Sequence, residues 1–143
     1  MRILLFGKSG LLGSEFLPLF EGDKKHHLFA YDHTDMDVTK EKDLQHAFTE
    51  AKPNFVINAT GYTNVDGAES DHVAAFAVNA AAVQRMALLS KEHQATFLHF
   101  STDYVFDGKK ETGYTETDIP HPINIYGKSK AAGDPMRTLQ ETS

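Results

Sequence analysis

The sequence predicts an α/β fold: a parallel, doubly wound sheet of the Rossmann type, flanked by helices. Three observations favour this class. Strand-like and helix-like segments alternate along the chain, the connections suit helical crossovers, and the first apolar run ends in a glycine-rich turn. That turn, Gly7-Lys-Ser-Gly-Leu-Leu-Gly13, carries three glycines between a predicted strand and a predicted helix.

Four short apolar segments have the length and composition of buried parallel strands. They cover residues 2–6, 27–31, 54–58 and 96–100. A doubly wound dinucleotide-binding sheet usually has about six strands. The sequence therefore predicts an unfinished sheet, and we interpret the carboxyl-terminal tail with its Pro135 as truncated or divergent.

Helical periodicity appears between the strands. It predicts helices over residues 11–20, 40–51 and 71–93, and a last one from about Ile123. Pro18 should kink or shorten the first helix. Asn79 stands among alanines in the third, where a polar side chain needs a partner, so it has either a structural hydrogen bond or a role in a site. A polar loop precedes the last helix.

Composition argues against several kinds of partner and chemistry. The chain has 14 basic and 20 acidic residues, for a net charge of −6, so nucleic acid is not an expected partner. The lack of cysteine excludes thiol chemistry and fits a reducing cytoplasm. The eight histidines do not have the spacing of a metal site, so no metal is predicted. The first apolar run is typical of a strand, so no membrane helix or signal peptide is expected there.

The glycine turn and the end of the second strand together favour a bound dinucleotide. Gly7 allows the tight turn, Gly10 lets backbone approach a pyrophosphate, and Gly13 lets the helix pack closely on the strand. Asp32 follows the second strand, where a carboxylate binds an adenosine ribose and disfavours a 2′-phosphate. Taken alone, the glycines also fit a plain tight turn and Asp32 a solvated loop acid. Two interpretations of Asp37 are open. It caps the second helix, or it flanks the adenine together with Val38.

Three side chains near the predicted fourth strand and last helix suggest proton transfer. Thr102 ends the fourth strand, which runs on into Ser101-Thr102-Asp103, and Tyr126 and Lys130 lie about one helical turn apart. A lysine ammonium at this spacing stabilises a phenolate and so makes the tyrosine a better acid. Thr102 alone would fit a strand-end cap, and a Tyr-x-x-x-Lys spacing alone is common.

In combination, these motifs resemble the extended short-chain dehydrogenase/reductases, and among them the dTDP-4-dehydrorhamnose reductase family. The matching segments are GKSGLLG, VINATGYTNVDGAES, VNAAAV, STDYVFDG and PINIYGKSKAAGD, which together span residues 2–134. Members of this family are considerably longer. The resemblance therefore implies that residues 1–143 form the NAD(P)-binding Rossmann-like domain, that the substrate-binding domain is absent, and that this chain alone is inactive.

The resemblance also implies a reaction and a set of roles. NADH or NADPH would reduce dTDP-4-dehydro-L-rhamnose to dTDP-L-rhamnose. The resemblance also suggests that the protein is cytoplasmic and forms a homodimer. Tyr126 would donate the proton, Lys130 would bind the nicotinamide ribose, and Thr102 would complete the triad, with Asp103 beside it at the sugar. The cofactor-binding residues would be Gly7, Gly10, Leu11, Leu12, Gly13, Asp32, Asp37, Val38, Gly61, Tyr62, Thr63, Tyr126 and Lys130. Glu15 matches a position that contributes to a metal between subunits in some members, but no metal is predicted here.

Three alternatives remain open. One is a non-catalytic NAD(P)-binding relative similar to the regulatory subunit of methionine adenosyltransferase. A second is a nucleotide-sugar epimerase, and a third is a cofactor-binding fragment without activity of its own. The segment Asn64-Val-Asp-Gly-Ala-Glu69 favours the sugar reductase over the first alternative.

Overall fold

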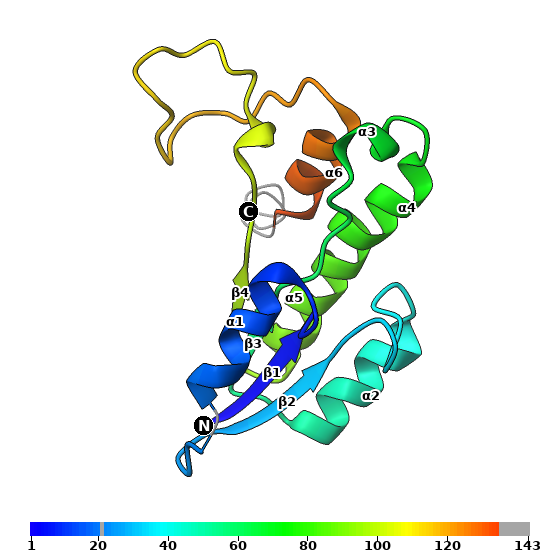
Figure 1. Cartoon of the computed structure of the whole chain (residues 1–143), viewed down its shortest axis with the longest axis vertical. Coiled ribbons are helices and arrows are strands. Elements are labelled where there is room, and N and C mark those ends of the chain that lie inside the picture. Colours follow the sequence, from blue (N-terminus) through cyan, green and yellow to red (C-terminus); the bar gives the residue numbers. More distant parts are fainter. Residues whose placement is uncertain (21, 135–143) are drawn as a thin grey trace.

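The computed structural model describes residues 1–20 and 22–134, which fold around one sheet (Figure 1). The sheet has four parallel strands in the order β2-β1-β3-β4. The strands are β1 (Arg2–Phe6), β2 (His27–Tyr31), β3 (Phe55–Asn58) and β4 (Thr96–His99). This confirms the predicted Rossmann-like class and the position of every predicted strand to within one residue.

The register of the strands brings their carboxyl ends to one edge of the sheet. Phe6 is paired with Tyr31 on one side and with Asn58 on the other, and Asn58 is paired with His99. The segments that follow these four residues therefore start side by side. In open parallel sheets this edge is where ligands bind.

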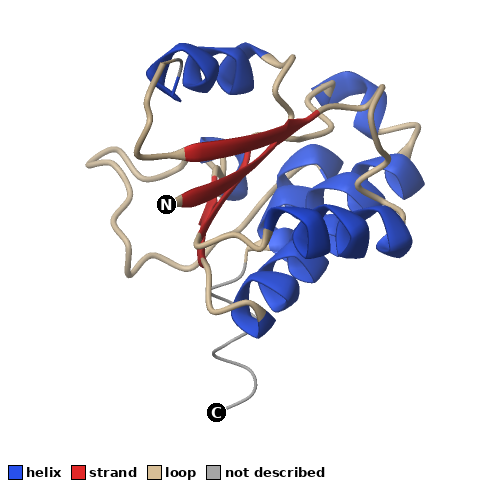
Figure 2. Ribbon diagram, turned by 90° about the horizontal axis from the view of Figure 1, so that it is seen from below, coloured by secondary structure: helices blue, strands red, loops and turns tan. Residues whose placement is uncertain are grey.

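Helices connect the strands and lie on both sides of the sheet (Figure 2). They are α1 (Leu11–Phe20), α2 (Glu41–Ala51), α3 (Val65–Ala68), α4 (His72–Phe76), the π-helical turn η1 (Ala77–Ala81), α5 (Ala82–Glu92), the 3₁₀ turn η2 (Asp103–Val105) and α6 (Ile125–Gly133). The sequence patterns did not indicate the short helices α3 and η2, because three or four residues are too few to show a helical period.

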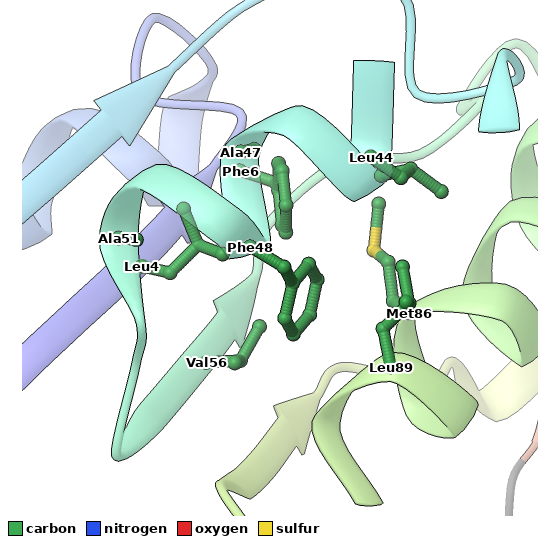
Figure 3. Close-up of a cluster of buried hydrophobic side chains, with 9 residues drawn as sticks. All are labelled: Leu4, Phe6, Leu44, Ala47, Phe48, Ala51, Val56, Met86 and Leu89. Atoms are coloured by element: carbon green, nitrogen blue, oxygen red, sulfur yellow. The ribbon is translucent and has the colours of Figure 1, made fainter. Parts of the chain in front are cut away.

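The face of the sheet covered by α2 and α5 has the larger fully buried core (Figure 3). Its buried members are Leu4, Phe6, Leu44, Ala47, Phe48, Ala51, Val56, Met86 and Leu89. On the opposite face, under α1, only Ile3, Leu5 and Ile57 among the described residues are fully buried, and partly exposed apolar side chains surround them. The alternation along β1 explains this division, because successive side chains of a strand point to opposite faces.

Three details of the helices differ from the sequence patterns. Pro18 lies inside α1, which continues to Phe20, so the helix is not shortened by it. Leu11 has the helical spacing of the apolar side of α1 but is 94% exposed. The last helix begins at Ile125, with Asn124 as its N-cap, rather than at Ile123. Pro135 and the tail after it lie outside the described residues.

The predicted helix over residues 71–93 is helical over His72–Glu92 but is not a uniform α-helix. It begins after the N-cap Asp71, whose side chain accepts a hydrogen bond from the backbone of Ala74, and it contains the π-helical turn η1. His72–Glu92 has the length and hydropathy of a membrane span. Its buried side chains Val83, Met86 and Leu89 are instead part of the protein interior, as in a core helix.

Candidate functional site

A cavity of about 760 Å³ lies at the carboxyl ends of β1, β2 and β3. Its walls come from the turn after β1, from the loop between β2 and α2, and from the segment after β3. The lining residues are Phe6, Gly7, Ser9, Gly10, Tyr31, Asp32, His33, Met36, Asp37, Val38, Lys40, Ala59, Thr60, Gly61 and Val78. The volume is that of a small-molecule site.

Two of the three glycines in the first turn are required by close backbone contacts. Gly7 has a positive φ of 88°, and a Cβ there would lie 2.8 Å from the carbonyl group of Ala59. A Cβ at Gly13 would lie 1.9 Å from the carbonyl oxygen of Gly7. Gly10 lines the cavity and has more room, because its nearest contact would be at 3.3 Å. Gly7 and Gly13 are thus required by packing, whereas Gly10 is less tightly packed and borders the cavity beside the start of α1.

The loop after β2 carries an acidic side chain in a fixed conformation. The Oδ1 atom of Asp32 accepts hydrogen bonds from the backbone N of Thr34 at 2.9 Å and from its hydroxyl at 2.7 Å. These hydrogen bonds lower the pKa of Asp32 to about 2, so the carboxylate is charged at neutral pH. Asp32 lines the cavity, as does the neighbouring His33.

Asp37 and Val38 line the same cavity further along the loop. The N-cap of α2 is Lys40, so the alternative that Asp37 caps this helix is wrong. Its carboxylate instead accepts hydrogen bonds from the hydroxyl and the backbone N of Thr39, and these hydrogen bonds lower the pKa of Asp37. Asp37 therefore shapes the loop in the way that Asp32 does.

Of the three residues predicted after β3, Gly61 lines the cavity. Tyr62 and Thr63 are not among its lining residues, and neither are Leu11, Leu12 and Gly13 after β1. Leu11 and Leu12 are exposed at the start of α1, next to the cavity-lining Gly10. Glu15 is also exposed, one turn further along α1. Among the residues 1–20 and 22–134, no group of three or more His, Cys, Asp or Glu side chains could hold a metal ion.

Asn79 joins the segment after β3 to the last helix. Its side chain is buried and forms a pair of hydrogen bonds with the backbone of Tyr62, accepting from N at 2.9 Å and donating to O at 3.0 Å. It also donates to the hydroxyl of Ser129 in α6 at 3.0 Å. Of the two roles considered for Asn79, the structural hydrogen bond is confirmed. The residue lies in a π-helical turn, and such turns often occur at functional sites.

Lys130 is nearly buried in the last turn of α6. Its ammonium donates a hydrogen bond of 2.6 Å to the carbonyl oxygen of Phe100, just beyond β4. Burial lowers the pKa of Lys130. The lysine therefore ties α6 to the carboxyl end of β4, at the same edge of the sheet as the cavity.

Tyr126 lies in the first turn of α6, against η2. Its ring packs edge-on against Tyr104, with the ring centroids 5.5 Å apart. The next residue, Gly127, permits this approach, because a Cβ there would lie 2.1 Å from the carbonyl oxygen of Tyr104. The N-cap Asn124 fixes the start of the helix by accepting a hydrogen bond from the backbone of Gly127 at 2.7 Å.

Thr102 is the N-cap of η2 rather than the end of a strand, since β4 ends at His99. Its hydroxyl accepts a long hydrogen bond from the backbone of Tyr104 at 3.3 Å and donates to Asp103 at 3.2 Å. Thr102, Asp103 and Tyr126 thus lie in the region where η2 packs on α6. They are not among the residues that line the cavity described above.

Sequence reasoning missed several residues that line the cavity, among them Ser9, Met36, Thr60 and Val78. Val78 had no local signal, because it reaches the cavity from a helix that is distant in sequence. Thr60 could have been found from the polar residue Asn58 at the end of β3. The side chain of Asn58 accepts hydrogen bonds from the backbone and the hydroxyl of Thr60 and so holds Thr60 at the sheet edge.

This fold, with a cavity at the carboxyl ends of its parallel strands, defines a Rossmann-like domain. Comparison with known proteins gives the family. The model described as "RmlD substrate binding domain" matches residues 1–140. The chain therefore belongs to this family, which confirms the resemblance found in the sequence.

The similar proteins agree with this assignment. A dTDP-4-dehydrorhamnose reductase of Aggregatibacter actinomycetemcomitans is 42% identical over 134 residues, which cover 93% of this chain and 45% of the relative. The crystal structure of such a reductase from Clostridium acetobutylicum has a TM-score of 0.90 at 34% identity, covering 97% of this chain and 49% of that one. The crystal structure of the reductase from Bacillus anthracis, in complex with NADP, has a TM-score of 0.86 at 34% identity. The match covers 98% of this chain and 49% of that one. The chain thus spans about half the length of the relatives it matches.

Proposed function

We propose that this chain supplies the cofactor-binding and proton-transfer half of a dTDP-4-dehydrorhamnose reductase. The observation that carries the proposal is the meeting of three elements at one edge of the sheet: the glycine turn, the segment after β4, and α6. The relatives named as this reductase, and the B. anthracis structure in complex with NADP, support the same function.

The cavity residues fit the adenosine and pyrophosphate parts of NADH or NADPH. Gly10 leaves room for phosphates near the backbone N–H groups at the start of α1. Asp32 holds a charged carboxylate where a ribose hydroxyl donates hydrogen bonds, and Val38 offers an apolar wall beside it. Leu11, Leu12, Tyr62 and Thr63 border this path and complete the proposed cofactor site.

Residues near η2 carry the proposed chemistry. When bound, the nicotinamide supplies a hydride to C4 of the sugar. Tyr126 donates its phenolic proton to the oxygen that becomes the new hydroxyl group. Lys130, fixed by Phe100, places its positive charge one helical turn from that phenol and stabilises the phenolate left behind. Thr102 and Asp103 hold the sugar carbonyl near Tyr126.

In this proposal Thr102 and Asp103 contact the sugar carbonyl, and the rest of the substrate is positioned by the half of the relatives that this chain does not match. We therefore expect residues 1–143 to bind the cofactor but not to turn over the nucleotide sugar, because proton and hydride donors act only on a carbonyl held within reach. A cytoplasmic location and a homodimer belong to the same proposal.

The test joins this chain to the half of a relative that it does not match. Residues 1–134 are joined to the carboxyl-terminal half of the A. actinomycetemcomitans reductase, and NADPH oxidation is measured with dTDP-4-dehydro-L-rhamnose. We expect turnover, and we expect Tyr126→Phe to lower it by roughly 10² to 10⁴, the usual range for general acid catalysis. Cofactor binding should stay nearly intact in this variant. The assigned role of Tyr126 as proton donor would be contradicted if the chimera folds, binds NADPH and turns over equally fast with and without the Tyr126→Phe substitution.

A further inference from the structure

A lysine and two aspartates form a charged cluster of which one member, Asp32, lines the cavity. The ammonium of Lys8 donates a hydrogen bond of 2.5 Å to Oδ2 of Asp35. The same carboxylate oxygen accepts a hydrogen bond from the backbone N of Asp32 at 2.9 Å. The backbone N of Lys8 donates to the carbonyl oxygen of Tyr31, which anchors the lysine beside the end of β2.

All three members of this cluster are charged at neutral pH. The hydrogen bond to Asp35 raises the pKa of Lys8, and the hydrogen bond from Lys8 lowers the pKa of Asp35. Asp32 is ionised as well, as described above. The cluster therefore carries one positive and two negative charges, and a phosphate group placed next to Asp32 would meet net repulsion while Lys8 stays with Asp35.

The ion pair between Lys8 and Asp35 is easily exchanged. The two side chains are 31% and 36% exposed, and ion pairs with this much solvent access contribute little to stability. A phosphate dianion attracts an ammonium more strongly than a single carboxylate does, because its charge is larger. Lys8 can therefore leave Asp35 when such a group arrives.

Among the described residues, two other basic side chains, those of Lys40 and His33, line the cavity itself. Lys40 lines the cavity, but its ammonium is 3.6 Å from Asp37 and its side chain is 69% exposed. His33 follows Asp32 directly and also lines the cavity. Only Lys8, among these three groups, shares its carboxylate partner with the backbone of Asp32, the residue assigned to the adenosine ribose.

We propose that Lys8 determines whether this pocket accepts NADPH as well as NADH. With NADH, Lys8 stays with Asp35, and Asp32 binds the free ribose hydroxyls. With NADPH, Lys8 moves from Asp35 to the 2′-phosphate and offsets the repulsion from Asp32. This inference rests on the proposed function, because it assumes that the adenosine ribose lies beside Asp32.

Two substitutions with opposite expected effects test it. Lys8→Met removes the cation and leaves both carboxylates, so NADPH should bind roughly tenfold more weakly while NADH changes little. Asp35→Asn frees the lysine, and its amide oxygen can still accept from the backbone of Asp32, so NADPH should gain severalfold over NADH. Cofactor fluorescence titrations of residues 1–143 give both dissociation constants. The differences should shrink as salt is added.

Matched controls separate this effect from a general change of charge. Lys24→Met makes the same change at an exposed position before β2, at the opposite end of that strand, and should leave the ratio of the two dissociation constants unchanged. If Lys40→Met shifts the ratio and Lys8→Met does not, the inference is wrong. If neither cofactor binds the parent chain, the proposed function fails and this inference fails with it. If both cofactors bind and the ratio of their dissociation constants is the same in the parent, Lys8→Met and Asp35→Asn, this inference alone is overturned.

Discussion

The adenosine end and the nicotinamide end of the proposed site are built in different ways. At the adenosine end, glycines allow two backbone segments to pack closely. The backbone of Gly13, for example, packs against the carbonyl oxygen of Gly7. At the other end, functional side chains are carried on α6, and contacts distant in sequence hold that helix in place, such as Asn79 with Ser129. The contact between Gly13 and Gly7 is made within one turn of the chain, whereas the contact between Asn79 and Ser129 joins separate elements.

The sharpest test of this difference introduces the same methyl group at both ends. Gly13→Ala forces a Cβ to within 1.9 Å of the Gly7 carbonyl oxygen, and Gly127→Ala forces one to within 2.1 Å of the Tyr104 carbonyl oxygen. Each should cost about 3 kcal/mol of unfolding free energy, at the upper end of the range for overpacking. We expect Gly13→Ala also to abolish NADH binding, whereas Gly127→Ala should retain it.

Urea denaturation and NADH titration at a temperature where both variants are folded measure these effects. Gly22→Asn is the control, because a Cβ at Gly22 meets nothing within 4 Å and asparagine tolerates the positive φ of 75° found there. If both variants lost NADH binding to the same degree, the two ends would not be independent.

Asn79 connects the segment after β3 with α6. Asn79→Ala removes hydrogen bonds to both backbone groups of Tyr62 and to Ser129. Buried groups left without partners should cost about 2 to 3 kcal/mol. Thermal unfolding measures the loss. Asn79→Asp keeps the acceptor for the backbone N of Tyr62 but has no donor in its ionised form, so it should also be less stable than the parent. A stability equal to that of the parent in both variants would show that this connection is dispensable.

The smallest expected effect is a dependence on acid. His99 ends β4, and burial lowers its pKa to about 4. The unfolded chain binds a proton near pH 6.5, so the folded state loses stability as the pH falls from about 6.5 to about 4 and loses no more below that. After allowance for partial solvent access of the ring, we expect a loss of about 1 to 2 kcal/mol.

Urea midpoints measured between about pH 7 and about pH 4, on either side of this titration, check the effect. His99→Gln should flatten the dependence on pH, whereas His27→Gln, at an exposed position at the start of β2, should leave it as it is. Parallel pH profiles for the parent and His99→Gln would show that other groups control the acid sensitivity.

The strands and the glycine turn could be predicted because their signals are local. An apolar run followed by Gly7 identifies β1 without knowledge of the rest of the fold, and the alternation of strands and helices gives the class. The π-helical turn η1 could not be predicted in this way. Its Asn79 is held by Tyr62 and Ser129, which lie in other parts of the chain.

The same distinction applies to the site. Asp32 and Gly10 line the cavity where their motifs indicate, since each lies just beyond a strand. The hydrogen bond from Lys130 to Phe100 joins residues 30 positions apart and could not be predicted from the spacing of Tyr126 and Lys130. Thr102 also differs from its prediction, because the chain leaves β4 three residues earlier and forms η2.

The central claim is that residues 1–143 contain a complete adenosine and pyrophosphate site. NADH titration of the parent chain and of Gly10→Val tests it most directly. Gly10 lines the cavity, and a Cβ there would lie 3.3 Å from the carbonyl oxygen of Gly7, which is a tight contact, so a branched side chain should block the phosphates and also lower stability somewhat. We predict saturable binding of NADH to the parent and at least roughly tenfold weaker binding to the variant, a difference of about 1.4 kcal/mol, under conditions in which urea denaturation shows both proteins to be folded. Equal affinities of the two proteins would contradict the claim.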